Sequence, residues 1–209
     1  MILNDVEELW VGGKSNLFEL YQVFFQTLDR KGKIEFLEWL VKETDFFRAP
    51  ASANNHGNYE GGLVEHSLQV YFNLVSLVRL SGIIIPKDTL IIVALTHDIC
   101  KANFYEATTR NVKINGVWVQ EPYFSIEDKF PLGHGEKSVI VLQKFMELTN
   151  EEIMAIRWHM GGFDDSARSY AGGLALSKAL QFYPLITLLH CADMISCLPE
   201  MERQTDRVI

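Results

Sequence analysis

The stretch Leu90-Ile-Ile-Val-Ala-Leu-Thr-His97-Asp98 decides how this sequence folds. Its first residues are all apolar, so a helix formed here is buried on every side rather than along one face. The stretch then ends in an imidazole and a carboxylate, which are costly to bury without compensating partners. We therefore expect a central helix that brings functional groups into the core of the protein.

Two other segments repeat this pattern. Apolar residues cover nearly every face of Leu63–Leu80, yet His66 lies among them, and Asp193 ends an apolar run that begins at Leu185. Buried imidazoles and carboxylates from separate helices can compensate one another by sharing a divalent cation. The pattern therefore favours a buried metal site over a set of unrelated polar residues.

Two further histidines are predicted at helix ends. His134 lies between two glycines at the start of a predicted helix, where free backbone N–H groups also favour an anion. His159 should lie at the end of a helix that opens with the capping box Thr149-x-x-Glu152 and stops at Gly161-Gly162. Both histidines are candidates to extend the same site.

The rest of the chain predicts an all-α fold with one small β insertion. Helical spacing indicates an N-terminal helical hairpin in residues 1–45, and a core at about residues 50–200. Asn115-Gly116, flanked by alternating β-branched residues, predicts a β-hairpin near residues 111–120. No repeat or linker interrupts the chain, so we expect one domain over residues 1–209.

Composition and charge limit the kinds of molecule that the protein is expected to bind. The chain has 209 residues, of which 48% are hydrophobic, and a net charge of −8. A protein that binds long nucleic acids needs a basic surface, which is missing here, so we expect a small substrate instead. The oligomeric state cannot be read from the sequence.

Signals for export, membrane insertion and thiolate metal sites are also missing. The N-terminus lacks a basic start followed by an apolar run, and no apolar stretch is long enough to span a bilayer. These features predict a cytoplasmic protein. Cys100, Cys191 and Cys197 have no Cys-x-x-Cys spacing, so we interpret them as reduced, buried, small hydrophobic residues.

Taken in order, the motifs resemble those of the HD superfamily of metal-dependent phosphohydrolases. The resemblance is carried by Gly61-Gly-Leu-Val-Glu-His66, by Thr96-His97-Asp98 and by Asp193. His134 and His159, each next to glycine-containing turns, are similar to the additional histidines of members that hold two metals. These include HD-GYP phosphodiesterases and bacterial HD-domain exoribonucleases. The fold that this resemblance implies is an HD-domain helical bundle.

The resemblance also implies a ligand set. In such a site a first metal is held by His66, His97, Asp98 and Asp193. Asp98 would bridge to a second metal, held also by His134 and His159. Nitrogen and oxygen ligands without thiolate favour one or two transition metals, manganese or iron first, with zinc, nickel or cobalt possible.

The expected chemistry is hydrolysis of a phosphoester or phosphoanhydride by a hydroxide that the metal activates. Asp98 and Lys101 are the candidate catalytic residues, and Lys101 and His56 are the candidate substrate-binding residues. Lys101 could instead complement a helix dipole, and His56 could be a solvated loop residue. His190, one turn before Asp193, could orient that ligand or be a core histidine.

A nucleotide-like substrate is common to the relatives, but the base, sugar and phosphate number are open. Gly-Tyr-Pro is missing after the second group of histidines, which disfavours cyclic dinucleotide hydrolysis of the HD-GYP kind. Two alternatives to a nucleotide phosphohydrolase stay open. One is a nucleotide-sensing module that keeps the metal site without turnover, and the other is a 3′-to-5′ exonuclease of short oligonucleotides.

Overall fold

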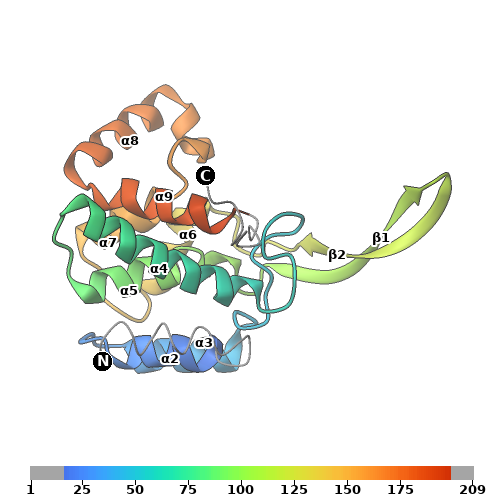
Figure 1. Ribbon diagram of the computed structural model, residues 1–209, viewed down its shortest axis with the longest axis horizontal. Coiled ribbons are helices and arrows are strands. Elements are labelled where there is room, and N and C mark those ends of the chain that lie inside the picture. Colours follow the sequence, from blue (N-terminus) through green and yellow to red (C-terminus); the bar gives the residue numbers. More distant parts are fainter. Residues whose placement is uncertain (1–16, 199–209) are drawn as a thin grey trace, which may run out of the picture.

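The protein is a bundle of helices from which one long β-hairpin projects (Figure 1). The computed structural model describes residues 17–198. The all-α fold with a β-hairpin insertion is therefore confirmed. The α-helices are α2 (Leu17–Gln26), α3 (Lys33–Glu43), α4 (Gly62–Ser81), α5 (Lys87–Thr96), α6 (His134–Leu142), α7 (Asn150–Arg157), α8 (Tyr170–Phe182) and α9 (Leu185–Ser196). Short 3₁₀ turns lie at η2 (Ile99–Lys101), η3 (Gly161–Phe163) and η4 (Asp165–Arg168), and the strands are β1 (Tyr105–Ile114) and β2 (Val117–Ile126).

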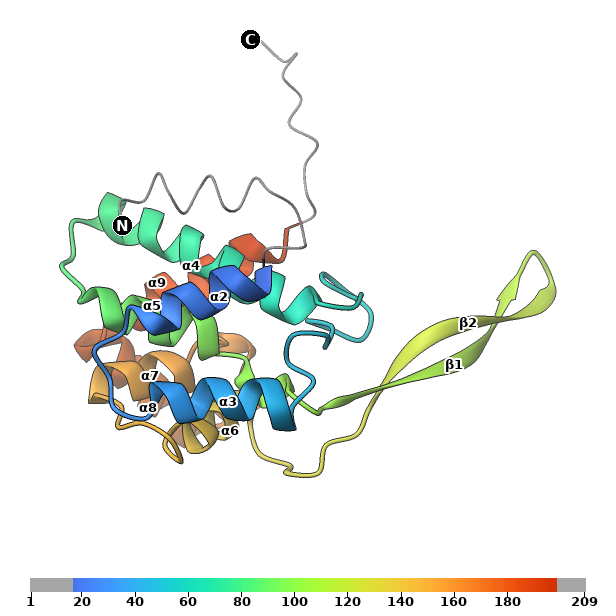
Figure 2. The same ribbon diagram turned by 90° about the horizontal axis from the view of Figure 1, so that it is seen from below.

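The most apolar helices form the centre of the bundle. Helix α4 packs against both α5 and α9, and α7 contacts α5 and α9 from the other side. Every residue of α5 from Thr89 to Thr96 is buried, as expected for a helix that is apolar all round. Helices α2 and α3 form a layer along one side of this centre (Figures 1 and 2). The segment expected as an N-terminal helical hairpin thus contains two helices from residue 17 on, while residues 1–16 lie outside the described part.

Helix α6 and the end of α7 are joined very closely. Gly135 allows this approach, because a Cβ atom at this position would lie only 2.2 Å from the backbone oxygen of Arg157. The guanidinium of Arg157, the last residue of α7, also pairs with a carboxylate of α6 and with one in the turn that follows α7. Its Nη2 lies 2.5 Å from Oε1 of Glu136 in α6, and its Nη1 donates a 2.7 Å hydrogen bond to Oδ2 of Asp164. The start of α6 and the turn after α7 are therefore fixed relative to each other.

The β-hairpin, which we call the arm (residues 105–126), is longer than predicted. Asn115 and Gly116 form the turn with φ angles of 49° and 86°, as the Asn-Gly signal predicted. The ladder continues beyond the expected residues 111–120, from Tyr105 paired with Ile126 to Ile114 paired with Val117. Most of its residues are exposed.

Side-chain contacts within the arm add to the backbone pairing of its two strands. Arg110 lies 2.7 Å from Glu121 on the opposite strand, and its guanidinium lies 4.9 Å from the ring centre of Tyr123. Arg110 also donates a 3.1 Å hydrogen bond to Oδ1 of Asn54, which lies outside the arm, in the loop before α4. The arm therefore extends away from the helices instead of closing over them (Figure 2).

The two ends of α7 differ in how well the sequence predicted them. The capping box at Thr149 and Glu152 is confirmed at the start of α7. Helix α7 ends at Arg157, before the predicted stop at Gly161-Gly162, so His159 lies in the turn that follows the helix. Within residues 17–198, no helix combines the length and the apolar character that a membrane-spanning segment requires.

Candidate metal centre

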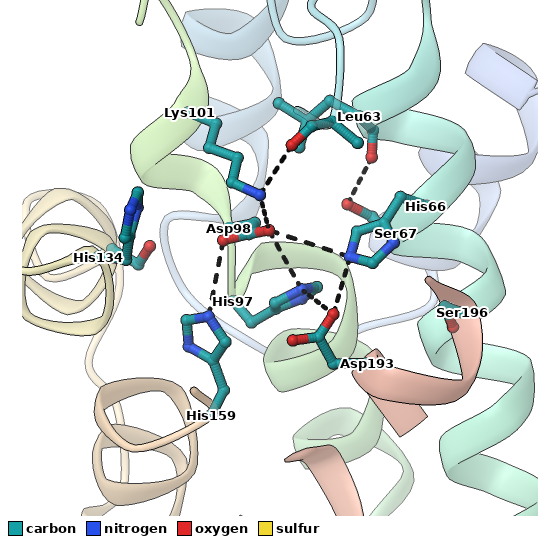
Figure 3. A network of polar contacts seen from close by, with 12 residues as sticks. Leu63, His66, Ser67, His97, Asp98, Lys101, His134, His159, Asp193 and Ser196 are labelled. Atoms are coloured by element: carbon teal, nitrogen blue, oxygen red, sulfur yellow. Dashed lines mark hydrogen bonds and ion pairs between the residues drawn. The ribbon is translucent and has the colours of Figure 1, made fainter. Parts of the chain in front are cut away.

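Separate elements bring a cluster of histidines and aspartates together in the middle of the bundle (Figure 3). We call it the His–Asp cluster, and its members are His66 from α4, His97 and Asp98 after α5, His159 after α7, and Asp193 from α9. His97 and His159 are fully buried, and His66 and Asp98 are 3% and 4% exposed. Asp193 is half-buried, with 13% of its side chain exposed, so the cluster is shielded from bulk water except at this residue.

The two carboxylates lie between the imidazoles. Oδ1 of Asp193 lies 3.1 Å from Nε2 of His66 and 3.9 Å from Nε2 of His97. Oδ2 of Asp98 lies 3.9 Å and 3.6 Å from the same two nitrogens. His159 approaches from the opposite side, with its Nε2 3.6 Å from Oδ1 of Asp98. All these atoms point toward a common centre.

The backbone fixes the orientation of two of these rings. Nδ1 of His97 lies 2.9 Å from the carbonyl oxygen of Ala94, and Nδ1 of His159 lies 2.7 Å from that of Ile156. Because a carbonyl oxygen can only accept, the neutral rings must carry their proton on Nδ1. Each Nε2 then presents a lone pair to the centre of the cluster. A backbone carbonyl bonded to the other ring nitrogen is the usual support of a metal-binding histidine.

The inward nitrogens are buried but have no hydrogen-bond partner. This holds for Nε2 of His66, His97 and His159, and also for Nδ1 of His66. The pKa of His97 is lowered to about 4, so its ring is neutral, and its Nε2 faces carboxylate oxygens, which places an acceptor against acceptors. Such an arrangement is costly unless a cation lies between them. The donor set therefore fits a divalent metal ion.

The surroundings keep the two aspartates ionised. Burial alone would raise the pKa of Asp98, but the charge of Lys101 and the neighbouring His97 bring this pKa well below its usual 3.8. For Asp193, burial is likewise outweighed, here by His66 and His97, and the pKa falls. Burial lowers the pKa of His97 to about 4. At neutral pH, Asp98, Asp193 and His97 can therefore bind a metal ion without first releasing a side-chain proton from a ligand atom.

Lys101 lies directly against the His–Asp cluster. Its Nζ lies 2.7 Å from Oδ2 of Asp98 and donates a 2.8 Å hydrogen bond to the carbonyl oxygen of Ala51. Burial disfavours its charge, but Asp98 outweighs this effect, so the pKa of Lys101 is raised above 10.5. The ammonium group therefore stays charged at the edge of the cluster, in a position to bind an anion.

His134 lies at the side of the cluster, as the first residue of α6, and is exposed. Its Nδ1 lies 3.4 Å from Sγ of Cys100, and it forms one group with Cys100 and Asp98 whose ligand atoms lie within 4.8 Å of one another. His159 belongs to a different group, with His97 and Asp193. The structure thus brings both histidines to Asp98, from two directions.

His56 also reaches the cluster, from the loop before α4. Its ring centre lies 4.9 Å from that of His66, and its Nε2 lies 3.3 Å from Sγ of Cys197. Burial lowers the pKa of His56, and the positive charge of neighbouring groups lowers it further. The half-buried, neutral ring forms the outer edge of the site.

The interpretation of all three cysteines as buried hydrophobic residues is correct for Cys100 but wrong for Cys191 and Cys197, which are half-buried, and it misses two contacts. Cys100 is buried beside His134, while Cys197 is half-buried beside His56 and lies 3.8 Å from Oδ1 of Asp193. Their positions, two residues after Asp98 and one helical turn after Asp193, were the available sequence signal. Burial raises the pKa of each thiol to about 12, with the nearby carboxylates adding to the effect.

His190 supports a different residue from the one expected. Its Nδ1 lies 2.7 Å from the carbonyl oxygen of His159, so α9 holds the turn after α7 in place. Gly161 leaves room for this ring, because a Cβ atom there would lie 3.1 Å from it, and the φ angle of 55° suits glycine. The contact joins segments 31 residues apart, so local sequence patterns do not reveal it.

Comparison with protein families adds one independent finding. The model of a family described as the HD domain matches residues 63–194, which is more than half of the 209-residue chain. The match includes the whole His–Asp cluster together with His134, but it ends before Cys197 and begins after His56. Neither the curated proteins nor the solved structures gave a match.

Proposed function

The chain belongs to the HD domain family, whose members are generally metal-dependent phosphohydrolases, and we propose that it hydrolyses a small nucleotide-like phosphoester or phosphoanhydride. The observation that carries this proposal is the set of buried, unpartnered imidazole nitrogens that face the carboxylates of Asp98 and Asp193. This arrangement is costly on its own and is explained if the residues hold divalent cations.

We assign the ligands as follows. A first ion would be held by His66, His97, Asp98 and Asp193, whose imidazole nitrogens and carboxylate oxygens lie 3.1 to 3.9 Å apart. A second ion would be held by His134, His159 and Asp98, so that Asp98 would serve both positions. The distances of His134 and His159 from Asp98 support this assignment, although the two histidines approach it from different sides.

The chemistry of the donors bears on the identity of the ions. Imidazole nitrogens mixed with carboxylate oxygens suit manganese, iron, cobalt, nickel or zinc better than magnesium. We favour manganese or iron. When bound, such ions supply Lewis acidity, which lowers the pKa of water from about 15.7 towards about 7 and polarises phosphoryl oxygens.

Lys101 is the residue best placed to contact the substrate phosphate. Its Nζ is held between Asp98 and the carbonyl oxygen of Ala51, so its position is fixed before the substrate arrives. A charged group fixed in this way can stabilise the negative charge that develops on a phosphoryl oxygen. Asp98 meanwhile stays ionised and orients Lys101 through the 2.7 Å ion pair.

His56 and the overall charge indicate the kind of substrate. His56 lies at the outer edge of the His–Asp cluster, where it can donate or accept a hydrogen bond to a bound substrate. The net charge of −8 disfavours a long nucleic acid, whereas a small anion can be held by the cations and Lys101. A nucleotide is therefore the substrate class that we favour.

A substrate panel tests the proposed function. The metal-free protein is loaded with Mn²⁺ and incubated with nucleoside mono-, di- and triphosphates, cyclic nucleotides and short oligonucleotides, and products are separated by chromatography. We expect turnover of at least one substrate, and none for Asp98→Asn. Calorimetry on the same panel identifies a sensing module, which would bind a nucleotide without consuming it. Bound Mn²⁺ without turnover of any substrate contradicts the proposal.

A further inference from the structure

A further group of metal-ligating side chains lies at the outer end of the His–Asp cluster, where His56 and Cys197 lie close to His66. The three residues offer ligand atoms that all lie within 4.8 Å of one another. They come from the loop before α4, from α4 itself and from the end of α9. We propose that His56, His66 and Cys197 form a separate position for a soft or borderline divalent cation, of which Zn²⁺ and Co²⁺ are the best candidates.

The contacts around Cys197 carry this proposal. Sγ of Cys197 lies 3.3 Å from Nε2 of His56 and 3.8 Å from Oδ1 of Asp193. Both nitrogens of His66 are buried and have no hydrogen-bond partner, so its ring can offer a lone pair to this side. His56 and Cys197 have no part in the two ion positions that we assign to the proposed hydrolase. The two assigned ion positions therefore do not account for the proximity of His56 and Cys197 to His66.

The donor types select the kind of ion. One sulfur and two imidazole nitrogens suit Zn²⁺ and Co²⁺, whereas Mg²⁺ and Ca²⁺ prefer oxygen. Cysteine binds as the thiolate, so the ion must displace the thiol proton to solvent. Three protein ligands leave one tetrahedral position open, as in zinc sites that bind water or a substrate group.

Sharing His66 has a consequence for the neighbouring position. A neutral imidazole has only one lone pair, so His66 cannot bind an ion beside Cys197 and another beside His97 at the same time. A soft ion on the Cys197 side therefore draws His66 away from the position that we assign to the first ion. Harder ions, which have no preference for sulfur, should leave Cys197 protonated.

The thiol of Cys100 offers a matched comparison at the opposite end of the cluster. Cys100 forms a similar group with His134 and Asp98. However, Asp98 is already engaged by Lys101 at 2.7 Å, and it lies within the His–Asp cluster itself. We therefore expect Cys197, and not Cys100, to provide the thiolate.

Cobalt absorption spectroscopy on the full chain tests the proposal. The metal-free protein is titrated with Co²⁺, and the near-ultraviolet charge-transfer band of a thiolate–cobalt bond is recorded. We expect this band in the wild type, in Cys100→Ser and in Cys191→Ser, and its loss in Cys197→Ser. His56→Ala should weaken Co²⁺ binding in the band-forming step by more than the roughly 10- to 100-fold that loss of an outer-shell partner causes. Circular dichroism of each variant checks that the fold is retained.

Two outcomes would overturn this inference. The first is cobalt binding by the wild type, seen in its visible bands, without any thiolate band. The second is a thiolate band that persists in Cys197→Ser and disappears in Cys100→Ser. Either result would leave the proposed hydrolase intact, because turnover with Mn²⁺ does not require Cys197. Conversely, a thiolate band in a protein without turnover would support this site and count against the proposed function.

Discussion

The end of α5 and the arm follow each other in the chain, separated by only a few residues, yet they are built in opposite ways. His97 is fully buried, whereas Trp118 near the tip of the arm is 68% exposed. Around His97 the polar side chains face inward, toward residues of α4, α9 and the turn after α7. In the arm, apolar side chains such as Val117 face outward. Changes near α5 should therefore affect metal binding and chemistry, while changes in the arm should affect neither.

The largest effect is expected for Asp98→Asn. The substitution keeps the shape of the side chain but removes the charge that faces three imidazoles and Lys101. We expect turnover to fall at least as far as the roughly 1,000-fold that loss of a single stabilising group can cause. Steady-state kinetics with Mn²⁺ measures this loss. If Asp98→Asn keeps near-normal turnover, the cluster is not the reaction centre.

A smaller loss is expected for Lys101→Met, which keeps the length of the side chain and removes its charge. If Lys101 stabilises the phosphoryl charge, kcat should fall on the order of 100-fold while the metal content stays the same. Lys137→Met is the matched control, because the Lys137 side chain is 11% exposed, close to the 14% of Lys101, but pairs with Asp128, outside the His–Asp cluster. Equal losses in the two variants would show that Lys101 has no specific role.

A still smaller effect is expected from removing the hydrogen bond between His190 and the carbonyl oxygen of His159. His190→Leu removes the hydrogen bond donor that fixes the turn carrying His159, and we expect Mn²⁺ affinity to fall roughly 10-fold. His190→Asn can still donate from its amide and should recover much of this affinity. Isothermal calorimetry well below the melting temperature measures both. The positioning role is wrong if the two variants bind Mn²⁺ as tightly as the wild type.

The smallest effect is expected when the arm is shortened. Ala107 and Phe124 are directly paired across the strands, so an Asn-Gly turn can join them and replace residues 108–123. Because the removed residues are mostly exposed, the free energy of unfolding should change by about 1 kcal/mol or less. Thermal unfolding and kinetics with the same nucleotide check this. A loss of turnover without a loss of stability would place the arm in substrate binding.

The same two regions show what the sequence could predict. The run before His97 indicated a buried helix that ends in functional groups, and α5 has this form. Asn115-Gly116 predicted the turn of the arm, because few residues adopt positive φ angles readily. Both signals are local, since they depend on side-chain chemistry and backbone preference over a few residues.

What the sequence could not predict depends on contacts that its local patterns do not indicate. The arm extends to Tyr105 and Ile126 because pairs such as Arg110 and Glu121 continue the ladder beyond the alternating apolar residues. The proximity of His56 to Cys197 spans 141 residues of chain. Only the packing of α4 against α9 brings such groups together.

Metal analysis tests the central claim most directly. The purified chain is stripped with a chelator, dialysed against Mn²⁺ and analysed for its metal content, alongside His66→Ala, Asp193→Ala and the arm variant. We predict one or two ions per chain in the wild type and the arm variant, and a clear loss of bound metal in both cluster variants. Retention of no metal by the wild type, or of equal amounts by all four proteins, would contradict the account.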